Sequence, residues 1–196
     1  MRLLQAMAGA RHGGAESFFV RLAIALARAG TAERVLIRGD AARAKALRDG
    51  GVEVTELPFG GLLDLATRRG FRRAIADWRP DVVLTWMNRA SRLCPQGDFV
   101  HVGRLGGYYD LKYYRHCDHL IGNTRDIVAY LVAQGWPKER AHYLPNFVAA
   151  TAAPPLARAS LDTPEGVPLA LALGRLHPNK GFDTLLVAVA ATKFGR

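Results

Sequence analysis

The sequence has few of the residues that build metal centres and disulfide frameworks. It contains two cysteines, Cys94 and Cys117, among 196 residues, and their spacing fits neither a metal site nor a set of disulfides. Two reduced thiols with structural roles, as in most cytoplasmic proteins, are the expectation. The six histidines form neither an HxxxH nor an HExxH pattern. The sequence therefore predicts no metal site.

Long hydrophobic runs are also absent. Residues 1–7 are too short an apolar stretch for a signal peptide. Nowhere does the chain reach the roughly 18 uncharged apolar residues that a transmembrane helix requires. We therefore expect a cytoplasmic protein, either free or bound at the inner face of the cell membrane.

The chain has fewer acidic than basic residues. Lys and Arg number 27 against 17 Asp and Glu, which gives a net charge of +10. This excess favours an anionic partner: a nucleic acid, an acidic lipid surface or a phosphorylated small molecule. A basic surface that is merely solvated explains the charge equally well. Because the basic residues are scattered over the predicted helices and no nucleic-acid-binding motif is present, a nucleic acid is the least favoured partner.

Several patterns typical of catalysis are missing. The chain has no GxSxG nucleophile elbow and no pair of carboxylates at a spacing that suggests acid–base chemistry. The loop at 8–16 carries Gly9, Gly13 and Gly14 and resembles a loop that cradles a phosphate. It is not a GxGxxG fingerprint, and it lacks a Walker A Lys-Ser/Thr. Two glycines at a helix start let backbone come close to a ligand, and a structural tight turn is the alternative.

What the chain does have is a regular alternation of short apolar runs and segments with helical periodicity. This alternation predicts an α/β fold with a Rossmann-like, doubly wound, mostly parallel sheet. The expected strands are 2–7, 34–38, 52–57, 81–86, 99–105, 119–122 and 141–144. The expected helices are 15–29, one capped by Asp40 and ended by Gly50, 60–78, a short one at 109–116, and one capped by Thr124 that runs to 134.

The last part of the chain has a different composition. Residues 149–166 are rich in Ala and Pro without a clear period, which predicts a linker after a first domain at 1–148. Residues 168–176 predict a buried strand, followed by a loop with Arg175 and Lys180 and a helix from Phe182. The free N–H groups of that helix, with two cations beside them, suit an anionic ligand. One strand and one helix cannot bury their own apolar faces, so 167–196 is expected to be the start of a second Rossmann-like domain that is truncated.

Residues that follow strands are the candidates for function, because ligands of such sheets bind at the carboxyl ends of the strands. Arg104, near the end of the strand at 99–105, is a candidate for an acceptor phosphate or carboxylate. Asn146 follows the last strand, just before the linker, where a plain turn is the alternative. His101 lies inside the strand of Arg104, where a histidine is more often packed than catalytic. The catalytic residue stays unassigned, with Arg104 and His101 as weak candidates.

Four segments, in order, resemble the family-4 glycosyltransferases. They are GGAE at 13–16, IGNT at 121–124, YLPN at 143–146, and the stretch 174–183, in which GRL is followed by KGFD. The last of these is similar to that family's donor-site signature. The segment RLGGYYD at 104–110 resembles bacterial members that build envelope polysaccharide or lipopolysaccharide.

The resemblance implies a GT-B fold, in which a first Rossmann-like domain binds a glycan or lipid-linked acceptor and a second binds a nucleotide-sugar donor. The sugar would be transferred with retention, without a metal or other cofactor. Arg175 and Lys180 would hold the donor diphosphate, and Gly13 and Gly14 would let backbone approach the same phosphates. The positive charge would also suit peripheral contact with an anionic membrane.

Two family features have no counterpart in the sequence. The paired glutamates of the second domain would lie beyond residue 196, and Arg104 stands near the strand end where many members carry a histidine. We therefore expect the 196-residue chain to be inactive alone. The alternative is a non-catalytic Rossmann-type module that binds a phosphorylated sugar or nucleotide.

Overall fold

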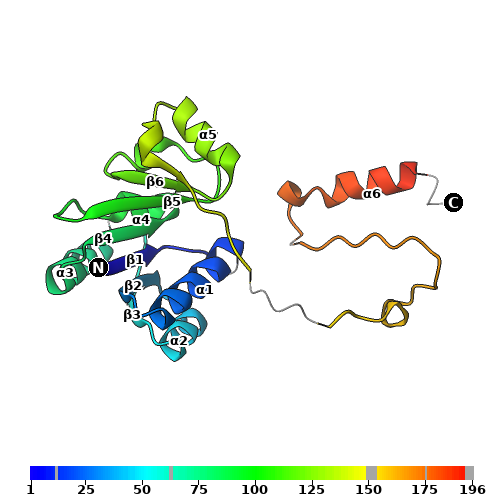
Figure 1. Cartoon of the computed structure of the whole chain (residues 1–196), viewed down its shortest axis with the longest axis horizontal. Helices are drawn as coiled ribbons and strands as arrows, with labels where there is room; N and C mark the ends of the chain where they lie inside the picture. The colour runs from blue at the N-terminus through cyan, green and yellow to red at the C-terminus, as the bar shows by residue number, and fades with distance from the viewer. Residues whose placement is uncertain (12, 62–63, 149–153, 175, 193–196) are drawn as a thin grey trace. The chain divides into compact units, whose positions relative to one another are not determined.

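The computed structural model describes residues 1–11, 13–61, 64–148, 154–174 and 176–192. The chain divides into two compact units, Met1–Val148 and Ala149–Arg196. Figure 1 shows a sheet flanked by helices in the first unit, and the helix α6 in the second.

The first unit is built on a single parallel sheet of seven strands. Their order across the sheet is β3-β2-β1-β4-β5-β6-β7, and every neighbouring pair is parallel. The reversal of strand order beside β1 makes this a doubly wound, Rossmann-like sheet, as the sequence predicts. The strands are β1 (Arg2–Met7), β2 (Ala32–Arg38), β3 (Glu53–Leu57), β4 (Val82–Trp86), β5 (Val100–Leu105), β6 (His119–Gly122) and β7 (Ala141–Tyr143).

Helices cover both faces of the sheet (Figure 1). The helices of the first unit are α1 (Gly14–Arg28), α2 (Ala41–Asp49), α3 (Leu65–Trp78), α4 (Met87–Leu93) and α5 (Arg125–Ala133). Alternate side chains of β1 point to opposite faces: Met7 packs with α1 and α2, and Leu4 packs with α3 and α4. A third apolar cluster joins β5, β6 and α5. Because both faces of the sheet are covered, the sequences of its strands are nearly continuous apolar runs.

Polar side chains fix where α2, α3 and α5 begin. Asp40 accepts the N–H of Arg43 at 3.0 Å, and Thr124 accepts the N–H of Ile127 at 3.1 Å, so both predicted caps are confirmed. The helix expected at 60–78 begins later, at Leu65, because Asp64 accepts the N–H of Thr67 at 2.8 Å and caps the helix there. Gly60, Gly61 and Asp64 are not helical, and residues 62–63 of the predicted helix lie outside the described residues.

The prediction of a short helix at 109–116 was wrong. The structure has only a 3₁₀ turn there, η1 (Leu111–Tyr113). Asp110 accepts the N–H of Lys112 at 2.9 Å, which makes a tight local turn in place of an α-helical start.

The second unit contains α6 (Phe182–Ala191), preceded by the 3₁₀ turn η4 (Pro178–Lys180). The predicted strand at 168–176 is not formed: residues 168–174 have no strand hydrogen bonding, and Leu171 and Leu173 are exposed. A parallel strand needs neighbours for its N–H and C=O groups, and no strand occurs among the described residues of this unit. The apolar pattern was therefore not sufficient to produce the strand.

Within the described part of the chain, the helices are too short or too polar to cross a bilayer. The same residues also contain no group of three or more His, Cys, Asp or Glu side chains that could hold a metal ion.

Candidate functional site

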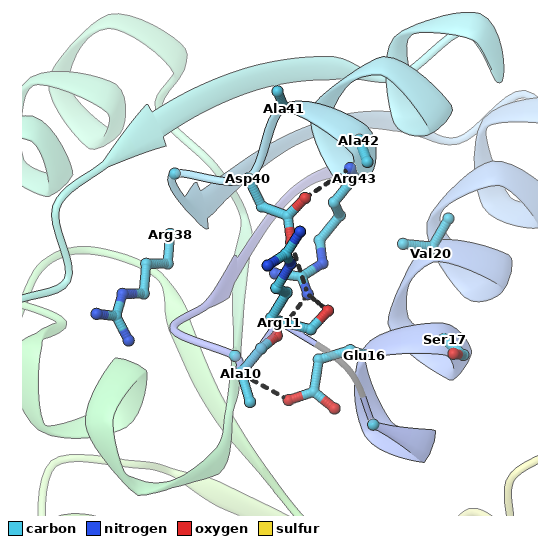
Figure 2. Close-up of a pocket in the computed structure, with 13 residues that line it drawn as sticks. Ala10, Arg11, Glu16, Ser17, Val20, Arg38, Asp40, Ala41, Ala42 and Arg43 are labelled. Atoms are coloured by element: carbon cyan, nitrogen blue, oxygen red, sulfur yellow. Dashed lines mark hydrogen bonds and ion pairs between the residues drawn. The ribbon is translucent and has the colours of Figure 1, made fainter.

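A large pocket of the first unit lies at the carboxyl ends of β1 and β2. It has a volume of about 810 Å³ and is bounded by the loop after β1, the start of α1 and the start of α2 (Figure 2). This is the edge at which a parallel sheet of this type binds ligands. Its side chains that carry charge are Arg11, Glu16, Arg38, Asp40 and Arg43.

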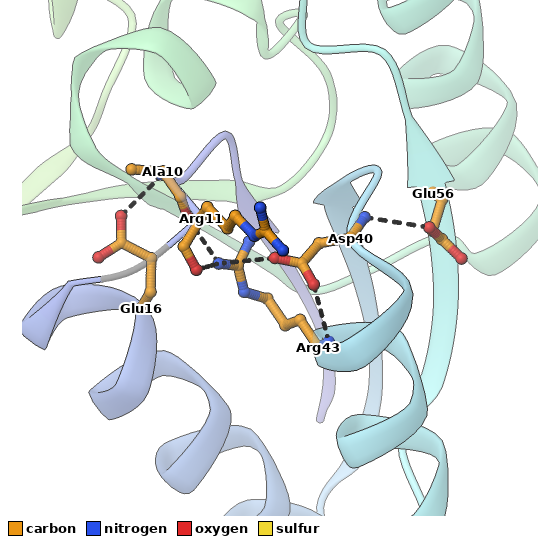
Figure 3. Close-up of polar contacts among 6 residues, drawn as sticks. All are labelled: Ala10, Arg11, Glu16, Asp40, Arg43 and Glu56. Carbon is orange, nitrogen blue, oxygen red and sulfur yellow. Dashed lines mark hydrogen bonds and ion pairs between the residues drawn. The ribbon is translucent and has the colours of Figure 1, made fainter.

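Glu16 explains the glycines of the loop after β1. Its side chain is buried and its Oε1 accepts the N–H of Ala10 at 2.8 Å (Figure 3). A Cβ on Gly13 would clash with Glu16 Oε2, and a Cβ on Gly9 would lie 2.8 Å from Glu16 Cγ. A side chain at either position would therefore force the Glu16 side chain to move. Around Gly14, by contrast, a Cβ would meet nothing within 4 Å.

Arg43, in α2, binds the loop after β1 through hydrogen bonds. Its guanidinium is buried and donates to the carbonyl oxygens of Ala10 at 2.6 Å and Arg11 at 3.3 Å (Figure 3). It also forms an ion pair with Asp40 at 3.3 Å. Asp40 thus caps α2 and neutralises the arginine that holds the loop. From the sequence, Asp40 was predicted only as a cap, and Arg43 was not singled out.

Two cations of this pocket remain available to a ligand. Arg11 and Arg38 are exposed, and neither forms an ion pair with any described residue. The helix α1 starts at the same pocket with Gly13 as its N-cap, and no side chain in the described residues caps it. The helix start leaves N–H groups without intrahelical partners and carries partial positive charge. The pocket can therefore hold an anion, with the carboxylates of Glu16 and Asp40 already engaged by the protein.

Arg104 does not line this pocket. It is 3 % exposed and donates to Asn146 Oδ1 at 2.8 Å and to the carbonyl oxygen of Leu144 at 3.0 Å. Its guanidinium also lies 4.9 Å from the ring centre of Phe18 and 5.1 Å from that of Trp86. Burial lowers the pKa of Arg104 to about 10, so it stays charged at neutral pH. The structure brings the two predicted residues Arg104 and Asn146 together.

His101 lies near the amino end of β5, whereas the pocket lies at the carboxyl ends of the strands. Its Nε2 is 2.9 Å from Thr85 Oγ1, and its Nδ1 is 3.1 Å from the carbonyl oxygen of His116. Burial lowers its pKa, which favours the neutral ring. Both ring nitrogens are thus engaged inside the protein, and the structure does not bring His101 to the pocket.

The predicted donor-phosphate residues fall in both units. Gly13, the N-cap of α1, lines the pocket. Gly14 is the first residue of the helix and is not among the residues that line the pocket. Lys180 ends η4 in the second unit and is exposed. Arg175 lies outside the described residues.

Comparison with known proteins places the chain in a family. The profile of glycosyltransferase family 4 matches residues 12–151. Over 181 residues the chain is 35% identical to the lipopolysaccharide core biosynthesis glycosyltransferase LpsD of Rhizobium meliloti (strain 1021). This alignment covers 90% of the chain and 52% of LpsD, so the chain spans about half the length of this curated relative.

Solved structures share the fold at low sequence identity. A glycosyltransferase from Rickettsia africae has a TM-score of 0.76 and 16% identity, over 98% of this chain and 57% of that protein. Anabaena Alr3699/HepE, solved in complex with UDP, has a TM-score of 0.58 and 16% identity, over 74% of this chain and 44% of that protein. With the parallel sheet, the glycine loop and the profile match across most of its length, the chain belongs to glycosyltransferase family 4.

Proposed function

We propose that the chain is part of a glycosyltransferase of lipopolysaccharide synthesis. It transfers a sugar from a nucleotide-sugar donor to a glycan or lipid-linked acceptor, with retention of the anomeric configuration and without a metal ion. The likeness to LpsD supports the lipopolysaccharide role, and the Anabaena protein bound to UDP supports a nucleotide-sugar donor. The enzyme works in the cytoplasm, at the inner face of the membrane.

The observation that carries the proposal is the pocket beside the start of α1. It combines an uncapped helix start with two cations, Arg11 and Arg38, that have no ion-pair partner among the described residues. A phosphate group accepts hydrogen bonds from N–H groups at such a helix start. Arginine adds charge and a planar pair of donors that match phosphate oxygens.

The roles of the other residues follow from the charge that develops in the reaction. When the bond between the sugar and the diphosphate breaks, negative charge grows on the departing phosphate. Arg175 and Lys180 supply positive charge to neutralise it, and Gly13 and Gly14 let backbone N–H groups come close. The acceptor binds to the first unit.

A titration followed by amide NMR tests the donor site in the 196-residue protein. UDP-, GDP- and ADP-sugars are added in turn, and the amides of Arg11, Gly13 and Gly14 are expected to shift with one of them. The variant Arg38→Gln should weaken this binding, whereas Arg28→Gln, an exposed arginine at the far end of α1, should not. No shift with any nucleotide-sugar would contradict the proposed donor site.

Release of free nucleotide in the presence of a lipopolysaccharide acceptor tests the transfer itself. We expect no turnover by the 196-residue chain and turnover once the second half of LpsD is fused behind it. Turnover by the chain alone at the rate of an intact enzyme would refute its proposed inactivity. Nucleotide-sugar binding without turnover in a folded fusion would favour a non-catalytic binding module.

A further inference from the structure

A second hollow of the first unit is lined mainly by basic side chains. It has a volume of about 530 Å³ and lies between α3, the end of α4 and η1. Its principal residues are Arg68, Arg72, Arg92, Lys112, Tyr113 and Arg115. Among the described residues that line it, none is a carboxylate. It shares no residue with the pocket at the start of α1.

Most of the positive charge in this hollow is not balanced by the protein. Arg68, Arg72 and Arg92 are exposed and form no ion pair with any described residue. By contrast, Arg73, next to Arg72 on the same helix, lies 3.5 Å from Asp77. Of the hollow's cations, Lys112 is the one with an ion pair in the described chain, to Asp110 at 2.7 Å.

The placement of these arginines costs the protein free energy. Arg68 and Arg72 are four residues apart on α3, so like charges face one another on the same side of the helix. Two like charges at this spacing destabilise a helix. Arg92 and Arg115 bring further positive charge to the same hollow from two other segments. A bound anion would remove this repulsion.

The walls of the hollow are held in place by the sheet. Gln96 and His116 are joined across it by a hydrogen bond of 3.1 Å. The carbonyl oxygen of His116 contacts the ring of His101 in β5 at 3.1 Å. Leu93 and Cys94 lie beneath as part of the buried core. The segments that carry Arg92 and Arg115 are therefore joined to each other and to β5, and a ligand would not have to order their backbone.

The hollow continues toward the carboxyl edge of the sheet. A smaller cavity of about 170 Å³ shares Arg92 and Tyr113 with it and is also lined by Asn88 and Arg89. Asn88 lies just after the end of β4, at the edge where the sheet binds ligands. We call the two cavities together the basic groove. It reaches from the carboxyl edge of β4 along α4 to the outer side of α3.

We propose that the basic groove binds a saccharide that carries at least two anionic groups, phosphate or carboxylate, and that this saccharide is the acceptor. The inference rests on the proposed function and specifies its acceptor as a polyanionic sugar. Arg68 and Arg72 hold one anionic group, and Arg92 and Arg115 hold another. The ring of Tyr113 packs against the sugar between them.

Shape favours a saccharide over a flat or a long polyanion. A concave site of about 530 Å³ is in the range of pockets that enclose small ligands. A membrane surface would be met by exposed cations on a convex face, and a nucleic acid by a longer basic tract.

The test uses glucose 1,6-bisphosphate as the probe, with glucose as the neutral control, added to the 196-residue protein in an amide NMR titration. We expect the bisphosphate to shift the amides of Arg68, Arg72, Arg92 and Tyr113, and glucose to leave them unchanged. The double variant Arg68→Gln/Arg72→Gln should weaken binding by about tenfold to a hundredfold, because two charge-assisted contacts are lost. The matched double variant Arg69→Gln/Arg73→Gln, on the same helix but outside the hollow, should weaken it less than twofold.

Three results would overturn the proposal. Shifts confined to the pocket at the start of α1 would place the anion elsewhere, and equal weakening by both double variants would indicate general charge attraction. Vesicles containing phosphatidylglycerol that bind with the same dependence on Arg68 and Arg72, and displace the bisphosphate, would assign the groove to a membrane surface. All variants lie on exposed positions, so unchanged circular dichroism is expected. The donor titration is followed at different amides, those of Gly13 and Gly14. A negative result for the basic groove would therefore not contradict the proposed donor site, and a negative result for the donor site would not contradict the groove.

Discussion

The guanidinium of Arg104 lies 2.8 Å from Oδ1 of Asn146, although 42 residues separate the two in the sequence. The same nitrogen donates to the carbonyl oxygen of Leu144, and the ring of Phe147 packs on Phe18 with ring centres 4.9 Å apart. Arg104 therefore ties the segment after β7 to the centre of the sheet. The buried Arg104 and the packing of Phe147 together hold the last residues of the first unit.

Loss of this contact should destabilise the first unit. Arg104→Met keeps most of the side-chain volume but removes both hydrogen bonds and the charge between Phe18 and Trp86. We expect a fall in the free energy of unfolding of about 1–3 kcal/mol, measured by urea denaturation. Arg69→Met, an exposed site with the same change of charge, should change it by less than about 0.5 kcal/mol.

Limited proteolysis supplies a second measurement of the same contact. If Arg104 holds the segment after β7, cleavage near 144–148 should be faster in Arg104→Met than in the parent protein. Asn146→Ala should cause a smaller increase, since it removes one hydrogen bond and leaves the one to Leu144. Equal cleavage rates in all three proteins would contradict the anchoring role.

The glycine at position 13 should be more sensitive to substitution than its neighbour. Gly13 has φ 171 and ψ 162, an extended conformation open to any residue, so the cost of Gly13→Ala comes from contact with Glu16 alone. We expect Gly13→Ala to cost about 1–2 kcal/mol of stability. Gly14→Ala, where the added methyl meets open space at a helix start, should be neutral or slightly stabilising.

A double-mutant cycle separates this contact from other causes. In a protein that already carries Glu16→Ala, the carboxylate is gone and Gly13→Ala should cost almost nothing. Urea denaturation of the four proteins gives the coupling energy, which should be about 1 kcal/mol or more. Additive effects would show that Gly13 is needed for a reason other than Glu16.

Much of the fold could be predicted because the signals are local. The strands at 2–7 and 119–122 have the predicted bounds, and Asp40 and Thr124 cap helices as expected, since each depends on a few neighbouring residues. The prediction of a strand at 168–176 was wrong. A strand also needs neighbouring strands to pair with, and an apolar pattern does not show whether they are present. The same holds for the helix at 109–116, where the side chain of Asp110 favours a tighter turn.

The functional surfaces were predicted less completely because they join distant segments. The glycine loop was visible in the sequence, but its anchor Arg43 contacts Ala10 across 33 residues, through the pairing of β1 with β2. The arginines of the basic groove come from three separate segments, and in the sequence they look like scattered charge. Because β1 and β2 are adjacent parallel strands, the loops that follow them lie side by side. A prediction of this strand order could therefore have indicated that Arg43 contacts the loop after β1.

Replacement of Arg43 should loosen the loop after β1. Arg43→Lys keeps the charge but cannot donate to both carbonyl oxygens in the same geometry. We expect amide hydrogen exchange at Ala10 and Arg11 to rise by about tenfold, and nucleotide-sugar binding to weaken. Arg48→Lys, on the same helix with an exposed ion pair to Glu56, should leave both measurements unchanged. Unchanged exchange in Arg43→Lys would show that Glu16 alone holds the loop.

Buried Glu33 should make the stability of the protein depend on pH. It is 8 % exposed and accepts a hydrogen bond of 2.8 Å from Gln5, whose own oxygen accepts from Trp86. Burial raises its pKa from 4.5 to about 7, and the bond from Gln5 offsets only part of that rise. Between these values the folded protein binds more protons than the unfolded one, so stability from this group falls as pH rises and levels off above pH 7.

The variant Glu33→Gln, which mimics the protonated side chain, should lose this dependence. Between pH 5 and pH 8 the parent protein is expected to lose about 2–3 kcal/mol more stability than the variant, measured by urea denaturation at both pH values. Glu139→Gln, at an exposed position, should follow the parent. Because the histidines titrate equally in all three proteins, their contribution cancels in the comparison. A parent and a Glu33→Gln variant with parallel pH profiles would mean that Glu33 is hydrated in the folded protein and carries its charge there.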